Sequence, residues 1–221
     1  KRTSPGPLPL PGDRPASIST GEVLAGRFRI VRFLGQGGMG EVYEAEDLEL
    51  KEHVALKTIR PEISSDERAL ARFKREIHLA RKVTHPNVCR IFDLFRHQRG
   101  GSEVTFLTME LLRGETLAER LRRGGRMTPA EAQPIVAGLA AGLAAAHQVD
   151  VIHRDFKSAN VMLVAARQGG GALRAVITDF GLARQPAGVD SSYSQSASGP
   201  GAMVGTPAYM APEQIKGGPI T

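Results

Sequence analysis

The stretch Leu34–Tyr43, LGQGGMGEVY, has four glycines in ten residues and continues directly into residues that favour a β-strand. Gly35, Gly37 and Gly40 have GxGxxG spacing, which is ambiguous by itself because dinucleotide-binding folds use the same string. In those folds the third glycine opens a helix, whereas Gly40 is followed by EVY and a further strand-like run. The stretch therefore predicts the tip of a β-hairpin, whose backbone amides can approach phosphate oxygens. A flexible turn without a ligand is the alternative.

The composition is that of a globular chain, since 221 residues with 41% hydrophobic content can bury one sizeable core or two modest ones. An excess of Lys and Arg (29) over Asp and Glu (23) gives a net charge of +6, which would suit an anionic partner. The bases are interleaved with acids, however, as in residues 68–82, RALARFKREIHLARK. This pattern favours a solvated helix face, and we expect no nucleic-acid partner.

Two features favour a cytoplasmic location. The single cysteine, Cys89, excludes an internal disulfide bond and lies in an apolar run that predicts burial. The longest uncharged stretch, residues 132–147, contains Gln133 and Pro134 and is shorter than the roughly 20 residues that span a bilayer. It predicts a buried helix and no membrane segment in this chain, and leaves open the anchoring of a longer parent protein through another segment.

The pattern divides the chain into a tail and two lobes. Residues 1–20 hold five prolines and few large apolar side chains, which predicts a disordered tail. Residues 21–112 predict a small α+β lobe with its hinge, in which one long helix accompanies five strand-like runs. The five runs are residues 27–34, 41–47, 52–59, 87–95 and 102–110. In the helix, Ser64 and Glu67 have capping-box spacing. The apolar residues that follow recur at helical intervals, namely Leu70, Phe73, Ile77 and Ala80.

Residues 113–221 have a mainly helical pattern. One helix is predicted at 115–123, and Thr128, Pro129 and Glu131 begin a second as N-cap, first residue and capping-box acid. Two glycines in the second helix predict close packing, because each costs about 1 kcal/mol of helix propensity. They are Gly138 and Gly142. Strand-like runs follow at 149–156, 160–166 and 174–181, with a predicted turn at 167–172 between the last two.

Three further motifs carry groups suited to phosphate chemistry. VALK (Val54–Lys57) places a lysine on the strand after the hairpin, where Glu76 of the following helix could hold it. HRDFKSAN (His153–Asn160) and DFG (Asp179–Gly181) supply carboxylates and an amide oxygen, which are ligands for hard cations.

Together these motifs resemble the protein kinase family, and specifically the eukaryotic-like Ser/Thr protein kinases of bacteria. GQGGMGEV, VALK, Glu76, HRDFKSAN, DFG, GTPAYM (Gly205–Met210) and APE (Ala211–Glu213) occur in the family's order. The resemblance covers Arg27 to Thr221. It implies an α+β, bilobal protein kinase fold with an incomplete second lobe, because a complete kinase continues for several helices beyond APE.

The resemblance implies an ATP site. Lys57 would contact the α and β phosphates with Glu76 fixing it, and Asn160 and Asp179 would hold Mg²⁺, with Mn²⁺ as an alternative ion. The other matched residues line the phosphates, the adenine, the gatekeeper position or the hinge. They are Leu34, Gly35, Gly37, Gly40, Val42, Ala55, Met109, Glu110, Leu112 and Met162. For the alanine and the two methionines, ordinary core packing is the alternative.

The resemblance also implies catalytic and regulatory roles. Asp155 would orient the acceptor hydroxyl, and Lys157 is typical of Ser/Thr kinases. Arg154 would pair with a phosphate on a serine-rich run, where we expect autophosphorylation with Ser198 favoured. Thr206 would contact the catalytic residues near the acceptor, while His153 is expected to be structural.

The implied function is that of a non-specific serine/threonine protein kinase, which transfers the ATP γ-phosphoryl group to protein hydroxyls in bacterial signalling. A pseudokinase or nucleotide-binding regulatory module would be expected to lack Lys57, Asp155 or Asp179, and all three are present. A small-molecule kinase of related fold is disfavoured by the GTPAYMAPE segment. Because the chain ends soon after APE, an inactive fragment of an active kinase is a further alternative.

Overall fold

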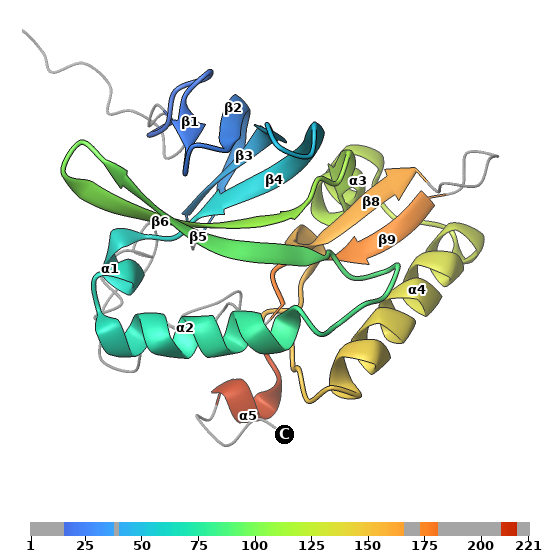
Figure 1. Cartoon of the computed structure of the whole chain (residues 1–221). Coiled ribbons are helices and arrows are strands. Elements are labelled where there is room, and N and C mark those ends of the chain that lie inside the picture. The colour runs from blue at the N-terminus through green and yellow to red at the C-terminus, as the bar shows by residue number, and fades with distance from the viewer. Residues whose placement is uncertain (1–15, 38–39, 166–172, 181–208, 216–221) are drawn as a thin grey trace, which may run out of the picture. The chain divides into compact units, whose positions relative to one another are not determined.

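A computed structural model describes residues 16–37, 40–165, 173–180 and 209–215 of the chain (Figure 1). The chain divides into two compact units. The smaller unit consists of residues 1–65 and 92–111, and the larger one of residues 66–91 and 112–221. The lobe boundary that we predicted at residue 112 stays a prediction.

The smaller unit is built on a six-stranded sheet with the strand order β1-β2-β3-β4-β6-β5. The strands are β1 (Val23–Leu24), β2 (Phe28–Gly37), β3 (Gly40–Asp47), β4 (Glu52–Thr58), β5 (Ile91–Arg99) and β6 (Ser102–Glu110). Each of the five predicted runs overlaps one strand. The short β1, which we did not predict, pairs antiparallel with β2, and helix α1 (Pro61–Ser64) follows β4.

The core of the smaller unit corrects the predicted extent of the tail. Tyr43, Leu56 and Phe106 are fully buried in this core, and Ile18 packs with them at 2% exposure. Residues 16–20, which we assigned to the disordered tail, therefore belong to the folded unit. The prediction was wrong there because one isoleucine among prolines and serines gives no periodic apolar signal.

Helix α2 (Glu67–Ala80) begins differently from our prediction. Asp66 is its N-cap, and the Asp66 carboxylate accepts hydrogen bonds from the amides of Arg68 (2.8 Å) and Ala69 (3.2 Å). The predicted capping box with Ser64 is wrong, because Ser64 instead ends α1. The predicted apolar face is confirmed, since all four of its residues are buried.

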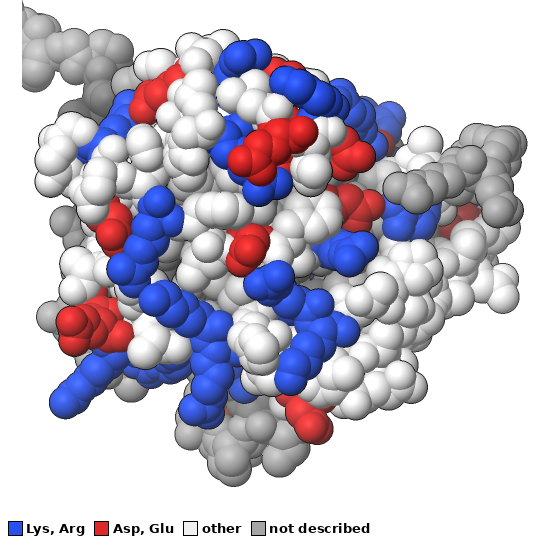
Figure 2. Space-filling model, in the orientation of Figure 1, with Lys and Arg blue, Asp and Glu red and all other residues white. Residues whose placement is uncertain are grey.

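The opposite face of α2 is basic. Figure 2 shows Lys and Arg side chains gathered over this helix, whose exposed bases include Arg68, Arg72, Lys74 and Arg75. An amphipathic helix with a buried apolar stripe and solvated charges accounts for this pattern, as we expected from the interleaved bases and acids.

The larger unit combines helices with a three-stranded sheet of order β7-β8-β9. The strands are β7 (Gly114–Thr116), β8 (Val161–Ala165) and β9 (Leu173–Ile177). Besides α2, the helices are α3 (Leu117–Gly124), α4 (Pro129–His147), α5 (Pro212–Ile215) and the 3-10 turn η1 (Ser158–Asn160). Figure 1 shows α4 lying along the β8–β9 hairpin.

Two of the three predicted strand runs in this unit contain strands, and the run at 149–156 does not. Asp150 and Arg154 within it have positive φ angles of 58° and 64°, which interrupt an extended conformation. The predicted turn at 167–172 lies outside the described residues.

Helix α4 starts as predicted, with Thr128 as N-cap, Pro129 as first residue and Glu131 closing the capping box. In the part of the chain that the structure describes, no helix combines the length and the apolar character that crossing a membrane requires. Cys89 is buried, which confirms its predicted packing role.

The two glycines of α4 lie against the loop that carries Asn87, which confirms the predicted close packing. A Cβ atom at Gly138 would lie 2.6 Å from the side-chain amide nitrogen of Asn87, and one at Gly142 would lie 3.1 Å from the backbone carbonyl oxygen of Asn87. That amide nitrogen donates to the carbonyl of Ala175 on β9 at 2.7 Å. Asn87 is thus held between α4 and β9.

We predict that Gly142→Val destabilises the protein by about 1–3 kcal/mol, because the added methyl groups would overlap Asn87 and Ile177. Helix propensity alone predicts a slight gain from this change. The matched control is Ala141→Val on the exposed side of the same helix, which should cost only about 0.5 kcal/mol. Urea unfolding measures both, and equal losses would contradict close packing at Gly142.

Candidate active site

Four residues matched to the nucleotide share one face of the smaller unit's sheet. Val42 on β3 pairs with Lys57 on β4, and Ala55 on β4 pairs with Met109 on β6. Opposed residues in an antiparallel pair point to the same side, and so do residues two apart on one strand. The four side chains therefore lie on the face opposite the core side chain of Leu56. Lys57 is 4% exposed, so its side chain is buried.

The glycines of the β2–β3 hairpin have different structural roles. Gly35 pairs with Val42 and Gly37 pairs with Gly40. Gly40 has a φ of 151°, and a Cβ atom there would lie 2.0 Å from the carbonyl oxygen of Thr58. At Gly35 and Gly37, no atom of the described residues lies within 4 Å of the Cβ position, apart from the glycine itself and its two chain neighbours. The fold itself thus requires glycine at position 40, whereas the other two leave open space for a ligand to approach the backbone.

The remaining residues matched to the nucleotide lie at the ends of strands or in the larger unit. Leu34 is 39% exposed on β2, and Glu110 ends β6 opposite Val54. Leu112 and Met162 belong to the larger unit. The predicted adenine site combines residues of both units and stays a prediction.

In the larger unit, Asp155, Lys157 and Asn160 form one hydrogen-bonded cluster. Lys157 Nζ lies 3.1 Å and 2.8 Å from the carboxylate atoms Oδ1 and Oδ2 of Asp155. The side-chain amide of Asn160 donates to the Asp155 carbonyl oxygen (2.8 Å) and to its Oδ2 (3.0 Å). The η1 turn reverses the chain so that residue 160 meets residue 155. The structure thus brings together three residues that we predicted to act at one site.

The pairing of β8 with β9 brings Asn160 against Thr178, the residue that precedes Asp179. Val161 opposes Ile177, so Asn160, immediately before β8, meets Thr178, immediately after β9. The amide and hydroxyl of Thr178 donate to the Asn160 carbonyl oxygen at 2.9 Å and 3.2 Å. Asp179 follows directly. An amide oxygen and a carboxylate are the hard oxygen donors that Mg²⁺ prefers, so these two residues fit the predicted ion.

His153 links the two loops and is buried at 2% exposure. Its Nε2 donates to the Thr178 carbonyl oxygen at 2.9 Å, and its Nδ1 accepts from the Asp155 amide at 3.3 Å. Burial lowers the pKa of His153 below its ordinary value, which keeps the ring neutral at pH 7, as acceptance at Nδ1 requires. These contacts give His153 the structural role that we expected.

Arg154 and Asp179 both have left-handed backbone conformations, with φ angles of 64° and 61°. Such strain at non-glycine residues concentrates at functional sites. Arg154 Nη1 lies 3.4 Å from Glu76 Oε1, an ion pair within the larger unit. The predicted pairing of Glu76 with Lys57 joins the two units and stays a prediction, as does a phosphate partner for Arg154.

Sequence reasoning missed two threonines that bind backbone groups beside the predicted residues. Thr178 precedes Asp179 and holds both the Asn160 carbonyl and His153. Thr58 follows Lys57, and its hydroxyl accepts from the Glu41 amide at 2.9 Å. Their adjacency to the matched motifs was the one sequence signal for them. The predicted residues Ser198 and Thr206 lie outside the described part of the chain.

Comparison with known proteins identifies the family. The family model described as protein kinase domain matches residues 28–221. The chain belongs to the protein kinase family. Among bacterial members, it is 40% identical over 198 residues to the serine/threonine-protein kinase pkn2 of Myxococcus xanthus. It is also 34% identical over 200 residues to PknB of Mycobacterium tuberculosis.

Each of these matches covers 90% of the chain but only 22% of pkn2 and 30% of PknB, so this kinase chain spans less than a third of either protein. Among solved structures, a double mutant of the PknI kinase domain from Mycobacterium tuberculosis matches with a TM-score of 0.69 at 27% identity. That match covers 92% of this chain and 69% of the PknI chain. The predicted protein kinase fold is thereby confirmed.

For this kinase we predict that Gly40→Ala lowers the free energy of unfolding by about 1–3 kcal/mol, because the methyl group would overlap the Thr58 carbonyl oxygen. Gly37→Ala is the matched control in the same hairpin and should change stability by less than about 0.5 kcal/mol. Guanidinium unfolding followed by circular dichroism compares the two. If Gly40→Ala is as stable as wild type, the close approach to Thr58 is wrong.

Proposed function

We propose that this protein kinase transfers the γ-phosphoryl group of ATP to serine or threonine hydroxyls of proteins. The observation that carries the proposal is the hydrogen-bonded cluster of Asp155, Lys157 and Asn160, held next to Asp179 by the β8–β9 pairing. Phosphoryl transfer depends mainly on positioning and charge neutralisation, and this cluster offers both. The acceptor class is supported by the relatives, which are named serine/threonine-protein kinases.

In the proposed reaction, the Asp155 carboxylate accepts the proton of the acceptor hydroxyl. The hydroxyl oxygen then forms a bond to the γ-phosphorus, and the bond from that phosphorus to its bridging oxygen breaks, so that ADP leaves. Lys157 is bonded to both carboxylate oxygens of Asp155 and orients them. Its ammonium group also places positive charge near the phosphoryl group in transfer.

Nucleotide binding is assigned to both units. Asn160 and Asp179 would hold Mg²⁺, or alternatively Mn²⁺, through their side-chain oxygens. Lys57 would contact the phosphates with Glu76 as its partner. Bound Mg-ATP supplies the phosphoryl group and part of the neutralising charge.

The regulation and location of the kinase are also proposals. We assign autophosphorylation to Ser198, with the Arg154 guanidinium as the partner of the phosphate. Thr206 would lie near the acceptor hydroxyl. A cytoplasmic site of action in bacterial signalling is supported by the buried single cysteine and by the bacterial relatives.

We predict that Asp155→Asn reduces phosphoryl transfer by a factor of about 10²–10⁴, because an amide cannot accept the hydroxyl proton. The matched control is Asp150→Asn, the same change at an exposed position with a φ of 58°, which asparagine tolerates well. Transfer of labelled phosphate from Mg-ATP to a generic protein substrate measures both. Equal labelling by wild type and Asp155→Asn would refute the assigned base.

A parallel measurement of Mg-ATP binding by calorimetry separates nucleotide binding from phosphoryl transfer. Wild-type protein that binds the nucleotide and transfers no phosphate would be a pseudokinase or an inactive fragment of an active kinase. Asp155→Asn should bind Mg-ATP with an affinity within about threefold of wild type, because the lost group acts on the acceptor rather than on the nucleotide.

A further inference from the structure

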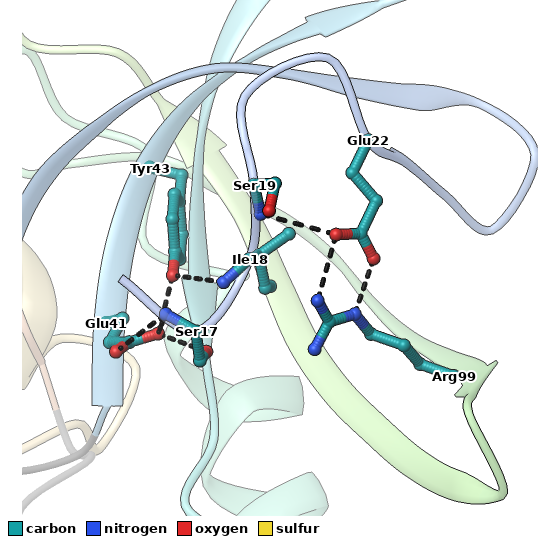
Figure 3. Close-up of polar contacts among 7 residues, drawn as sticks. All are labelled: Ser17, Ile18, Ser19, Glu22, Glu41, Tyr43 and Arg99. Carbon is teal, nitrogen blue, oxygen red and sulfur yellow. Dashed lines mark hydrogen bonds and ion pairs between the residues drawn. The ribbon is translucent and has the colours of Figure 1, made fainter. Parts of the chain in front are cut away.

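The segment Ala16–Glu22, which we call the strap, lies against the smaller unit's sheet at the start of β3 (Figure 3). Ser17 contacts Glu41, the residue that follows the last glycine of the hairpin. The Ser17 amide donates to the Glu41 carboxylate oxygens at 3.3 Å and 3.2 Å, and the Ser17 hydroxyl donates to Oε2. The strap is therefore hydrogen-bonded to β3 at the point where the strand leaves the glycine-rich turn.

Tyr43 extends this contact into the core. The phenol oxygen accepts from the Ile18 amide at 3.1 Å and donates to the Glu41 carboxylate at 2.5 Å. Burial raises the pKa of Tyr43, and the bond to Glu41 raises it further, so the phenol keeps the proton that it donates. One buried side chain thus connects the strap backbone with Glu41.

The strap is anchored independently at both ends. Ile18 is buried in the core at 2% exposure. Glu22 forms an ion pair with Arg99 on β5, with Arg99 Nη2 at 3.0 Å from Glu22 Oε2. The Gly21 amide donates to the Ile30 carbonyl oxygen on β2 at 2.7 Å. A segment fixed at these points can hold Glu41 in place instead of following its motion.

Electrostatics favour the contact at neutral pH. Burial raises the pKa of Glu41, but the hydrogen bonds from Ser17 and Tyr43 lower it by more, so the pKa lies below its ordinary value. Glu41 is therefore a carboxylate with donors directed at it, and hydrogen bonds to an ionised acceptor are stronger than neutral ones.

Glu41 is also held from the side of β4. The Glu41 amide donates to the Thr58 hydroxyl at 2.9 Å, and the same hydroxyl lies 3.3 Å from the Glu41 carbonyl oxygen. Gly40, immediately before it, is packed on the Thr58 carbonyl, and Val42, immediately after it, opposes Lys57. The strap and Thr58 thus fix Gly40, Glu41 and Val42 at the start of β3. Val42 is the residue that opposes Lys57, the proposed phosphate-binding lysine.

The strap cannot touch a nucleotide bound on the face of Lys57. Val42 shares that face with Lys57, whereas Glu41 and Tyr43 alternate with Val42 and point to the other side of the sheet. The core side chains, including Ile18, lie on this other side. Any effect of the strap on the nucleotide must therefore act through the position of β3.

We propose that Ser17 and Glu41 are positioning residues, through which the strap fixes the start of β3 and so sets the affinity for ATP. This inference rests on the proposed function, since it takes the Lys57 face as the nucleotide site. Loss of the contact should weaken nucleotide binding and leave the transfer step itself unchanged.

The test uses the full chain and four substitutions. Ser17→Ala should raise KM for ATP about three- to tenfold with kcat within about twofold of wild type, as loss of a hydrogen bond to a charged group would. Ser17→Thr keeps the hydroxyl and should restore KM. Ser17→Asp places a second carboxylate against Glu41 and should raise KM more than alanine does. Ser19→Ala is the matched control, because Ser19 joins the strap through its backbone amide and carbonyl.

Hydrogen exchange without nucleotide gives a second readout that does not depend on activity. The Glu41 amide, bonded to Thr58, should exchange about three- to tenfold faster in Ser17→Ala than in wild type and Ser19→Ala. An unchanged KM together with unchanged exchange at Glu41 would overturn the proposal, as would a fall in kcat with KM unchanged. If the Glu41 amide exchanges faster in Ser17→Ala but the wild type does not bind Mg-ATP, the proposed function is refuted while the strap is retained as a positioning element of β3.

Discussion

The antiparallel pairing of β8 with β9 is the constraint on which the candidate active site depends. It brings the end of one loop, Asn160, against the start of another, Thr178. His153 then bonds the Thr178 carbonyl through one ring nitrogen and the Asp155 amide through the other. The backbone and a neutral imidazole thus fix the geometry.

In the smaller unit, strand register likewise positions the candidate site residues. Because β3, β4 and β6 pair without a bulge at Val42, Ala55 and Met109, their side chains emerge on one face. A shift of one residue would turn Lys57 into the apolar core, where an ammonium group without polar partners is costly. Gly40 lies so close to β4 that any side chain there would overlap the Thr58 carbonyl oxygen. The glycine that the motif requires is therefore also a packing requirement of the sheet.

The sequence allowed prediction of features with local causes. The capping box at Thr128, the strand-like runs and the kinase motifs depend on residues a few positions apart, and each has a known physical signature. The cluster of Asp155, Lys157 and Asn160 was predicted through its spacing in one motif.

The features that could not be predicted depend on partners distant in sequence or on competing local choices. Asp66 displaced Ser64 as N-cap, because both residues are good caps but Ser64 is the last residue of the short helix α1. The segment 149–156 has the composition of a strand, yet its conformation is set by contacts of His153 with a loop 25 residues away. The pattern of apolar and polar residues along the sequence does not report such long-range contacts.

The two faces of the smaller sheet have different roles in the proposed nucleotide site. One face presents Lys57, and the other carries the core together with the contact between Ser17 and Glu41. Because neighbouring residues on a strand point in opposite directions, a side chain on the back face can fix the backbone of a residue whose own side chain faces the ligand. A segment before the motif, rich in proline and serine, can therefore affect nucleotide binding without resembling any part of the family pattern.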